Sequence, residues 1–253
     1  MTREARVGLE AFRALYPDAE EAGGAVVMRA PAGIDAPMLN RIVGLGVERP
    51  ATEADVDAAL ACMGEESSCY VSVAADARPA GLARWLQARG LRAGWGWMGF
   101  HRPAGEMEPR PETALRLLEV SSPEEASAFG KVIAAGYELP AAATAWAATA
   151  PGRGWLCWLA LDGDEPAAAA ALFVLDGAGY LGFAATLPDH RRKGAQGALL
   201  AVRMERARAL GCDLLVTETG ERREGLPSNS YRNILRAGFE ETGVTANWLR
   251  PGG

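Results

Sequence analysis

The stretch Ala184–Leu200 runs A-A-T-L-P-D-H-R-R-K-G-A-Q-G-A-L-L and contains the most informative signals for the fold of this chain. Small and apolar residues open it in a pattern typical of a strand, and a basic turn then leads into a helical pattern. The first N–H groups of a helix have no partner within the helix, and the helix dipole is positive there. We therefore expect this turn to bind an anion such as a pyrophosphate.

The turn supplies both charge and space for such an anion. Arg191, Arg192 and Lys193 place three cations at its mouth. Gly194 and Gly197 lack a Cβ, which lets the turn tighten and lets phosphate oxygens approach the main chain.

Strand and helix signals on either side of the turn predict a mixed α/β fold. Aspartate-glycine pairs, which favour hairpins, separate three apolar runs and predict an antiparallel meander. Ser122 and Glu125 form a capping box that opens a helix towards Ala135. The predicted strands of this half cover Leu115–Val120, Trp155–Leu161, Ala167–Leu175, Tyr180–Thr186 and Cys212–Thr217, and further helices cover Ala195–Leu210 and Ser230–Ala237.

Pro188, Arg191 and Gly194 fall as in the pattern P-x-x-R-x-x-G-x-G/A of the GCN5-related N-acetyltransferase (GNAT) superfamily, which residues 114–253 resemble. The pair Gly238-Phe239, after a short helix, resembles the terminal G-F of that family. Gln196 departs from the pattern because the family usually has Gly or Ala there. Its main-chain N–H can still donate, provided that its side chain points away from the phosphates.

The resemblance implies a GNAT fold and a chain that transfers an acetyl group from acetyl-CoA, or another acyl group from a related acyl-CoA, to an amine. In the family the acyl thioester lies between two strands that separate, where main-chain groups of the fourth strand hold it. The residues expected to bind the acyl-CoA are Thr186, Leu187, Arg191, Arg192, Lys193, Gly194, Ala195, Gln196 and Gly197.

Two residues are candidates for proton transfer. Glu218 follows the predicted fifth strand, so its carboxylate can accept the proton of the attacking amine, directly or through a water. Many family members place a tyrosine four residues before the terminal glycine, where this chain has Ile234. Tyr231 lies one helical turn earlier on the same face, and we expect it to protonate the leaving thiolate.

For the amine acceptor, the resemblance points to the region between the first two helices of the second half. Tyr137, Glu138 and Trp146 lie there, and they suit packing as well as they suit substrate binding. An acylated cysteine at Cys157 or Cys212 is the weaker idea, because direct attack needs no covalent intermediate. We expect all four cysteines to be reduced, and with only two histidines we expect no metal site.

The proline-rich, charged segment R-P-A-G-E-M-E-P-R-P-E at 102–112 has the composition of a linker. It divides the chain into residues 1–104, a linker at 105–113 and an acyl-CoA-binding domain at 114–253. Residues 85–91, W-L-Q-A-R-G-L, align with residues 233–239, N-I-L-R-A-G-F, and the register continues through Arg102 and Arg250.

This repeat predicts two tandem GNAT-like domains. Glu53, Asp55 and Asp57 stand in the first half where the second half has its basic turn, and they would repel a pyrophosphate. We therefore expect one CoA per chain, with the first half serving as a scaffold or as a wall of the acceptor site. Its own strands are predicted at Ala25–Arg29 and Cys69–Ala74, and its helices at Glu53–Met63 and Gly81–Arg89.

Composition limits the partners. With 32 acidic and 26 basic residues the net charge is −6, which disfavours nucleic acid, and no apolar segment is long enough to span a bilayer. We expect a cytoplasmic protein whose acceptor is a small-molecule or peptide amine. Two other functions fit the motif: a non-catalytic regulatory module that binds CoA, and a tandem-GNAT aminoacyl transferase, which the acidic composition disfavours.

Overall fold

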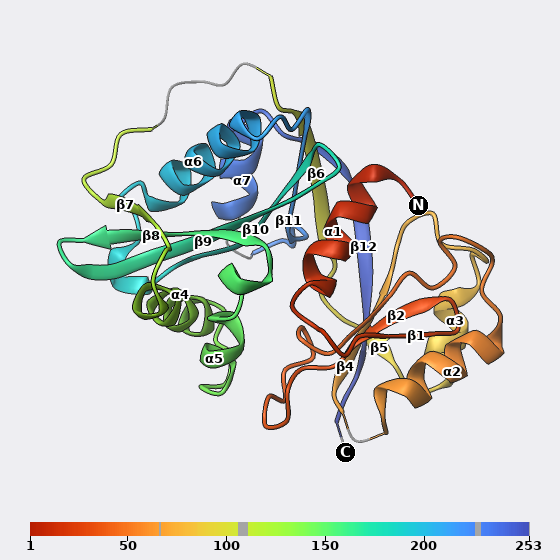
Figure 1. Cartoon of the computed structure of the whole chain (residues 1–253). Helices are drawn as coiled ribbons and strands as arrows, with labels where there is room; N and C mark the ends of the chain where they lie inside the picture. The colour runs from red at the N-terminus through yellow and green to blue at the C-terminus, as the bar shows by residue number, and fades with distance from the viewer. Residues whose placement is uncertain (66, 106–110, 226–228, 253) are drawn as a thin grey trace. The chain divides into compact units, whose positions relative to one another are not determined.

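The computed structural model describes residues 1–65, 67–105, 111–225 and 229–252, coloured along the chain in Figure 1. These residues form two compact units. Unit 1 comprises Met1, 16–99 and 242–253, and unit 2 comprises 2–15 and 100–241. Most of the predicted linker, residues 106–110, lies outside the described residues. The predicted division at 105–113 follows the chain order, whereas the compact units interleave along the chain.

Unit 2 contains the predicted meander and the strand that follows it. Across its sheet the strands are, in order, β6 (Trp97–Pro103, in this unit from Phe100), β11 (Leu214–Gly220), β10 (Ala178–Thr186), β9 (Glu165–Leu175), β8 (Trp155–Asp162) and β7 (Arg116–Glu119). The pairs among β7, β8, β9 and β10 are antiparallel, and β10 pairs with β11 in parallel. The hairpin between β9 and β10 turns through Asp176 and Gly177, both at positive φ, as the Asp-Gly signal predicts.

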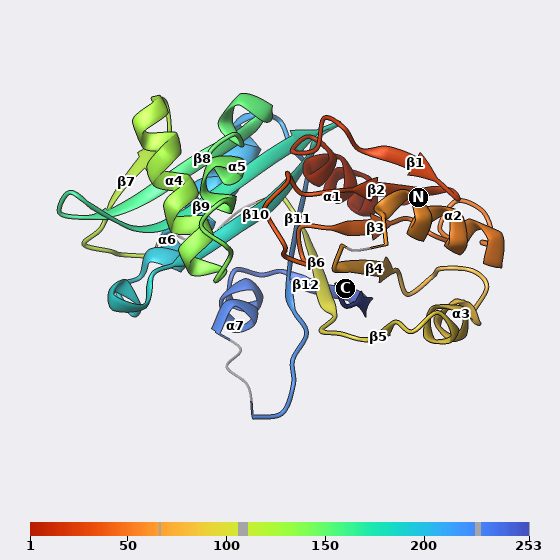
Figure 2. The same cartoon turned by 90° about the horizontal axis from the view of Figure 1, so that it is seen from below.

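Helices cover both faces of this sheet. They are α1 (Arg3–Arg13), α4 (Pro123–Gly136), α5 (Ala143–Ala147), α6 (Ala195–Ala209) and α7 (Asn229–Arg236), with short 3₁₀ turns at Pro151–Arg153 and Pro188–His190. Figures 1 and 2 show α6 on one face and α4 and α5 on the other. The predicted capping box of α4 is present, since Ser122 Oγ accepts from the Glu125 N–H and Glu125 accepts from the Ser122 N–H.

Unit 1 has its own sheet and core. Its strands are, in order, β1 (Glu20–Ala22), β2 (Ala25–Met28), β3 (Arg41–Val43), β4 (Cys69–Val73) and β12 (Glu240–Arg250, in this unit from Thr242), with β5 (Arg92–Ala93) also pairing with β12. Helices α2 (Glu53–Met63) and α3 (Leu82–Ala88) bury Val56 and Leu86 against Val27 and Ile42. The two helices and two strands predicted in this half agree with α2, α3, β2 and β4.

The last strand of each sequence half belongs to the sheet of the other half. Residues 246–250 of β12 pair antiparallel with residues 69–73 of β4 in unit 1. In the other direction, β6 neighbours β11, and the Ala104 N–H donates to Asp213 O at 2.9 Å. Neither strand was predicted from the sequence, because their partners are remote in the chain.

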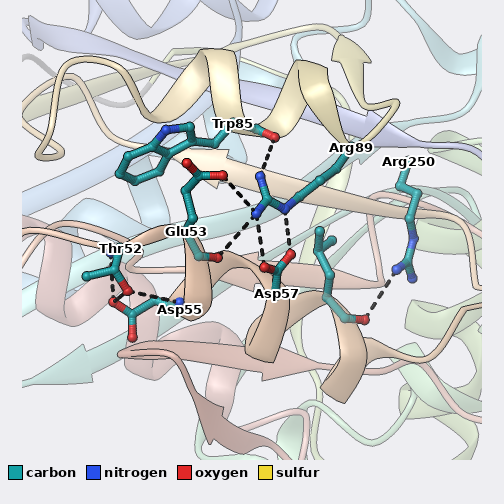
Figure 3. A network of polar contacts seen from close by, with 8 residues as sticks. Thr52, Glu53, Asp55, Asp57, Trp85, Arg89 and Arg250 are labelled. Carbon is teal, nitrogen blue, oxygen red and sulfur yellow. Dashed lines mark hydrogen bonds and ion pairs between the residues drawn. The ribbon is translucent and has the colours of Figure 1, made fainter.

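Carboxylates at the start of α2 are all engaged within unit 1 (Figure 3). Asp55 accepts from the main chain and hydroxyl of Thr52 and forms a two-point ion pair with Arg49, at 2.7 and 2.8 Å. Arg89 donates to both oxygens of Asp57 and to Glu53. The first turn of α2 is therefore occupied by acidic groups of its own chain.

We expect Asp55→Asn to lower stability in a pH-dependent way. The bond to Arg49 holds the pKa of Asp55 well below its usual range, so the carboxylate stabilises the fold above the unfolded pKa of about 3.9. That contribution is lost as the pH falls through the lower, folded pKa. In thermal unfolding followed by circular dichroism, the midpoint difference from wild type should be largest near pH 7 and shrink below about pH 4. Asp76→Asn, at an exposed residue, is the control; a difference that grows in acid would contradict the prediction.

Candidate functional site

Strands β10 and β11 separate before either of them ends. Their parallel pairs run from Ala178 opposite Leu214 to Leu181 opposite Thr217. Thr217 Oγ1 donates to Leu181 O at 2.7 Å and so fixes the last pair. Among the described residues, 182–186 of β10 and 218–220 of β11 continue without pairing to each other. We call this feature the strand separation.

A bulge in β10 accompanies the strand separation. On the β9 side, Gly182 lies opposite Ala171, but the next pair is Ala185 with Ala169, so β10 carries one extra residue. Phe183, in the bulge, has φ of 47°, which is unusual for a bulky side chain. Its ring packs edge-on against the aromatic rings of Phe12, Trp146 and Trp155, at centroid distances of 6.0, 6.1 and 4.9 Å.

The two predicted thioester-binding residues differ in the direction of their main-chain donors. The Leu187 N–H donates to Ala167 O at 2.9 Å and is therefore used by β9. Thr186 pairs with Ala168, and successive N–H groups of a strand point to opposite sides. The Thr186 N–H thus points to the β11 side, into the strand separation.

Helix α6 starts at the basic turn without a capping side chain. Gly194 is its N-cap residue, at φ of 80°, and no described side chain bonds the first N–H groups of the helix. By contrast Thr2, Thr52 and Ser122 cap α1, α2 and α4 through their hydroxyl groups. The first turn of α6 also contains no acidic residue. This helix start therefore presents main-chain donors and a positive dipole end without a competing anion.

The three cations of the turn differ in their surroundings. Lys193 Nζ bonds Asp162 Oδ2, and His190 Nδ1 lies 2.9 Å from the same oxygen. Lys193 and then His190 hold the pKa of Asp162 below its usual range. The charge of Lys193 is thus matched by a carboxylate of the same chain, while Arg191 and Arg192 are exposed at the turn.

The two glycines of the turn admit a neighbouring segment of the chain. A Cβ on Gly194 would lie 3.0 Å from Glu112 O, and one on Gly197 would lie 3.3 Å from Pro111 Cγ. Thr113 Oγ1 donates to Lys193 O at 2.7 Å. The close approach that the glycines permit is made by residues 111–113, and an approach by phosphate oxygens stays a prediction.

Gln196 turns its side chain towards α7. Its Nε2 donates to Ser230 Oγ at 2.8 Å, and its Oε1 accepts from Asn233 Nδ2 at 2.6 Å. Ala195, the first residue of α6, is buried. The departure from the family pattern at Gln196 therefore leaves the main chain of the turn uncovered by that side chain.

Glu218 and Tyr137 both lie near the strand separation. Glu218 is the first residue of β11 after the last pair with β10, inside the strand rather than after it as predicted, and it is half-buried. The Tyr137 hydroxyl donates to Ala184 O at 3.4 Å. Burial, together with the charge of Glu218, raises the pKa of Tyr137 to about 12. Glu138 is exposed, at φ of 55°, and Trp146 is buried against Phe183.

Both the ring and the hydroxyl group of Tyr231 have partners within unit 2. Its ring meets Phe100 edge-on at a centroid distance of 4.9 Å, and its hydroxyl donates to Glu241 Oε1 at 2.6 Å. Burial and the bond to Glu241 raise the pKa of Tyr231 to about 12. Ile234, at the usual position of the family's tyrosine, is buried as well.

Other chemistries find little support in the described residues. All four cysteines are free, and burial raises the thiol pKa of Cys157 and Cys212, which disfavours the nucleophilic thiolate. Within the described ranges no three histidine, cysteine or acidic side chains group as a metal site would need. None of the described helices has the length and apolar character to cross a bilayer.

Comparison with known proteins identifies the domain around this site. Residues 124–226 match the model of the acetyltransferase (GNAT) family. Those residues belong to the GNAT family. The match includes the meander, the strand separation and the basic turn, so this part of the chain is a GNAT acetyltransferase domain. A search of curated proteins gave no match.

Solved structures with the GNAT fold superpose on nearly the whole length of the chain. The GCN5-related N-acetyltransferase from Kribbella flavida superposes with a TM-score of 0.68 at 22% identity, covering 100% of this chain and 97% of that chain. A tandem GNAT protein from the clavulanic acid biosynthesis pathway superposes with a TM-score of 0.62 at 16% identity, covering 98% and 87%. At these identities the likeness concerns the fold.

The anion site expected at the basic turn predicts that removing the carboxylate of Asp162 strengthens the binding of CoA. Asp162→Asn takes one negative charge away from the turn and leaves Lys193 able to meet a phosphate, so we expect Kd to fall about threefold at low salt. Titration calorimetry with CoA at two salt concentrations measures this, since screening should reduce the gain. Asp164→Asn, two residues away and exposed, is the matched control. A weaker affinity for Asp162→Asn would show that the Lys193–Asp162 pair instead supports the site.

Proposed function

We propose that the chain is an acyl-CoA-dependent N-acyltransferase that transfers the acetyl group of acetyl-CoA to an amine by direct attack. One observation carries this proposal: within one unit, an uncapped helix start at a basic turn follows directly on a strand that separates from its parallel neighbour. The first feature suits a pyrophosphate, and the second suits a thioester. Membership of residues 124–226 in the GNAT family supports the same reading.

Acyl-CoA binding is assigned to the residues predicted from the sequence, except that the main-chain N–H of Leu187 is already used by β9. In this proposal the main-chain donors at the start of α6 bind the pyrophosphate, and Arg191 and Arg192 add charge. Thr186, whose N–H points into the strand separation, binds the thioester oxygen and stabilises the negative charge that develops there.

The transfer forms a bond between the amine nitrogen and the acyl carbon and breaks the carbon–sulfur bond. Glu218, on the opposite side of the strand separation, accepts the proton that the amine loses, directly or through a water. Tyr231 supplies a proton to the departing sulfur, and its raised pKa keeps the phenol protonated at neutral pH.

A small-molecule or peptide amine is the proposed acceptor, bound near Tyr137, Glu138 and Trp146. The proposal assigns one CoA to each chain. In the first half the start of α2, which carries the acidic residues that the repeat places opposite the basic turn, is already occupied by its own carboxylates. That half is proposed to act as a scaffold or a wall of the acceptor site.

A non-catalytic CoA-binding module is the second candidate. The observation that favours it is the bond between the Tyr231 hydroxyl and Glu241, because a hydroxyl held in this way is not aimed at a leaving group. Calorimetry with CoA and a thioester-consumption assay over a panel of amines separate the two. Binding without turnover would support the module, and turnover would support the enzyme.

Reversing both arginines of the turn should abolish most CoA binding. For Arg191→Glu combined with Arg192→Glu we expect Kd to rise at least a hundredfold, because two attractive charges become repulsive beside a pyrophosphate. Calorimetry gives the affinity and, in the wild type, the expected stoichiometry of one. Circular dichroism checks the fold, and the same reversal at exposed Arg206 and Arg208 is the control. Unchanged affinity in a folded double variant would contradict this assignment.

Loss of the Tyr231 hydroxyl should slow turnover without weakening CoA binding. Tyr231→Phe is expected to lower kcat at least tenfold, or about 1.4 kcal/mol of barrier, because the thiolate then has no protein acid. Steady-state kinetics across the pH range, together with calorimetry, measures both quantities. Full turnover in the Phe variant at every pH would assign thiolate protonation to solvent.

A further inference from the structure

Arg203 is a charged side chain in the interior of unit 2. It lies on α6 with only 2% of its surface exposed, and it is among the largest fully buried side chains. Its Nε donates to Leu199 O at 2.9 Å, and its Nη1 donates to Ala171 O at 3.2 Å and to Gly182 O at 3.1 Å. These acceptors are all main-chain carbonyls.

The carbonyls of Ala171 and Gly182 lie at the same level of the sheet, on neighbouring strands. Ala171 and Gly182 are opposite each other and form the last regular pair of β9 and β10 before the bulge. Gly182 also follows Leu181, the last residue of β10 that pairs with β11. The guanidinium therefore sits where β10 changes from a fully paired strand to one paired on a single side.

A positive charge at this place is costly. Burying an ion costs several kcal/mol unless a charge partner compensates for it, and none of the ion pairs found among the described residues includes Arg203. Burial lowers the pKa of Arg203 to about 10, which still leaves it charged at neutral pH. An apolar side chain would fill the space between α6 and the sheet without this cost, but it would not bond the carbonyls of Ala171 and Gly182, so the arginine serves the main chain at this place.

On the opposite face of the sheet, α4 and the residue that follows it contact the same bulge. The Tyr137 hydroxyl, just after α4, donates to Ala184 O, and α4 approaches β10 so closely that a Cβ on Gly136 would lie 2.5 Å from Ala185 Cβ. Figure 1 shows α4 and α6 on the two faces of the sheet. The carbonyls of Gly182 and Ala184, on either side of Phe183, are thus each bonded by a side chain from a different face.

We propose that Arg203 is a positioning residue for acyl transfer: its guanidinium, together with the Tyr137 hydroxyl, fixes the β10 bulge and thereby aims the Thr186 N–H at the thioester oxygen. This inference rests on the proposed function. A shift of the donor by about 1 Å is enough to cost a hundredfold in rate, because an oxyanion donor acts only in the correct geometry. The phosphates bind at the other end of the turn, so CoA affinity should not depend on Arg203.

The test compares Arg203→Lys and Arg203→Gln with the wild type. Lysine keeps the charge but has one nitrogen where arginine uses two, whereas glutamine keeps a donor without the charge. We expect kcat to fall at least tenfold in Arg203→Gln and less in Arg203→Lys, with the Kd for CoA and the KM for the amine within twofold of wild type. Arg206→Lys and Arg206→Gln, one turn along α6 at an exposed residue, are the matched controls and should keep full kcat.

Tyr137→Phe extends the test to a variant that loses only a hydroxyl, in case the Arg203 variants fail to fold. It should lower kcat by a smaller factor, again with the Kd for CoA unchanged. Full kcat in the folded Arg203→Gln variant overturns the inference, as does full kcat in Tyr137→Phe if the Arg203 variants do not fold. A wild type that binds CoA but acylates no amine in the panel contradicts the proposed function itself, and this inference with it.

Discussion

Main-chain polar groups of β10 need partners once the strand leaves β11, and much of unit 2 is arranged around that requirement. Inside a protein, carbonyl and N–H groups without partners are costly. Arg203 and Tyr137 bond two carbonyls of the bulge, β9 keeps the N–H of Leu187, and Thr217 closes the last parallel pair. Among the described residues, the stretch of β10 that faces the strand separation lies between these bonded groups.

The starts of helices α2 and α6 differ in the groups that lie at the positive end of the helix dipole. At α2, Thr52 and Asp55 form a capping box, and Arg49 neutralises the carboxylate. At α6, Gly194 caps without a side chain, and the cations precede the helix. At α2 the chain's own side chains already bond the first turn and balance the helix dipole. At α6 the first N–H groups and the dipole are left for a ligand. This difference gives a physical basis for the proposal of a single CoA site in this chain.

Local signals allowed much of this fold to be predicted. The capping box of α4, the Asp-Gly hairpin after β9 and the basic turn before α6 each depend on residues close in sequence, and each lies where predicted. The likeness of the turn to the GNAT pattern also gave the family and fold correctly.

Features that depend on remote partners were not predicted. Strand β12 has a largely polar, glycine-containing sequence, and its partners β4 and β5 are remote in the chain. Arg203 follows Ala201 and Val202 with no motif around it, and its burial becomes evident only when the carbonyls of β9 and β10 are placed. A hint existed, because Arg203 lies three and four residues from the apolar Leu200 and Leu199, on the face of the helix that must pack.

Because the last strand of each half lies in the sheet of the other half, the direction of synthesis determines when each sheet can be completed. Synthesis proceeds from the N-terminus, so residues 16–99 leave the ribosome before any of 111–241, yet their sheet is completed by residues 242–250. Until those residues emerge, the β4 edge presents unpaired main-chain groups, a surface that invites wrong pairing. The half of the chain that is made first therefore completes its sheet last, and we expect the nascent chain to be most exposed to wrong pairing before residues 242–250 emerge.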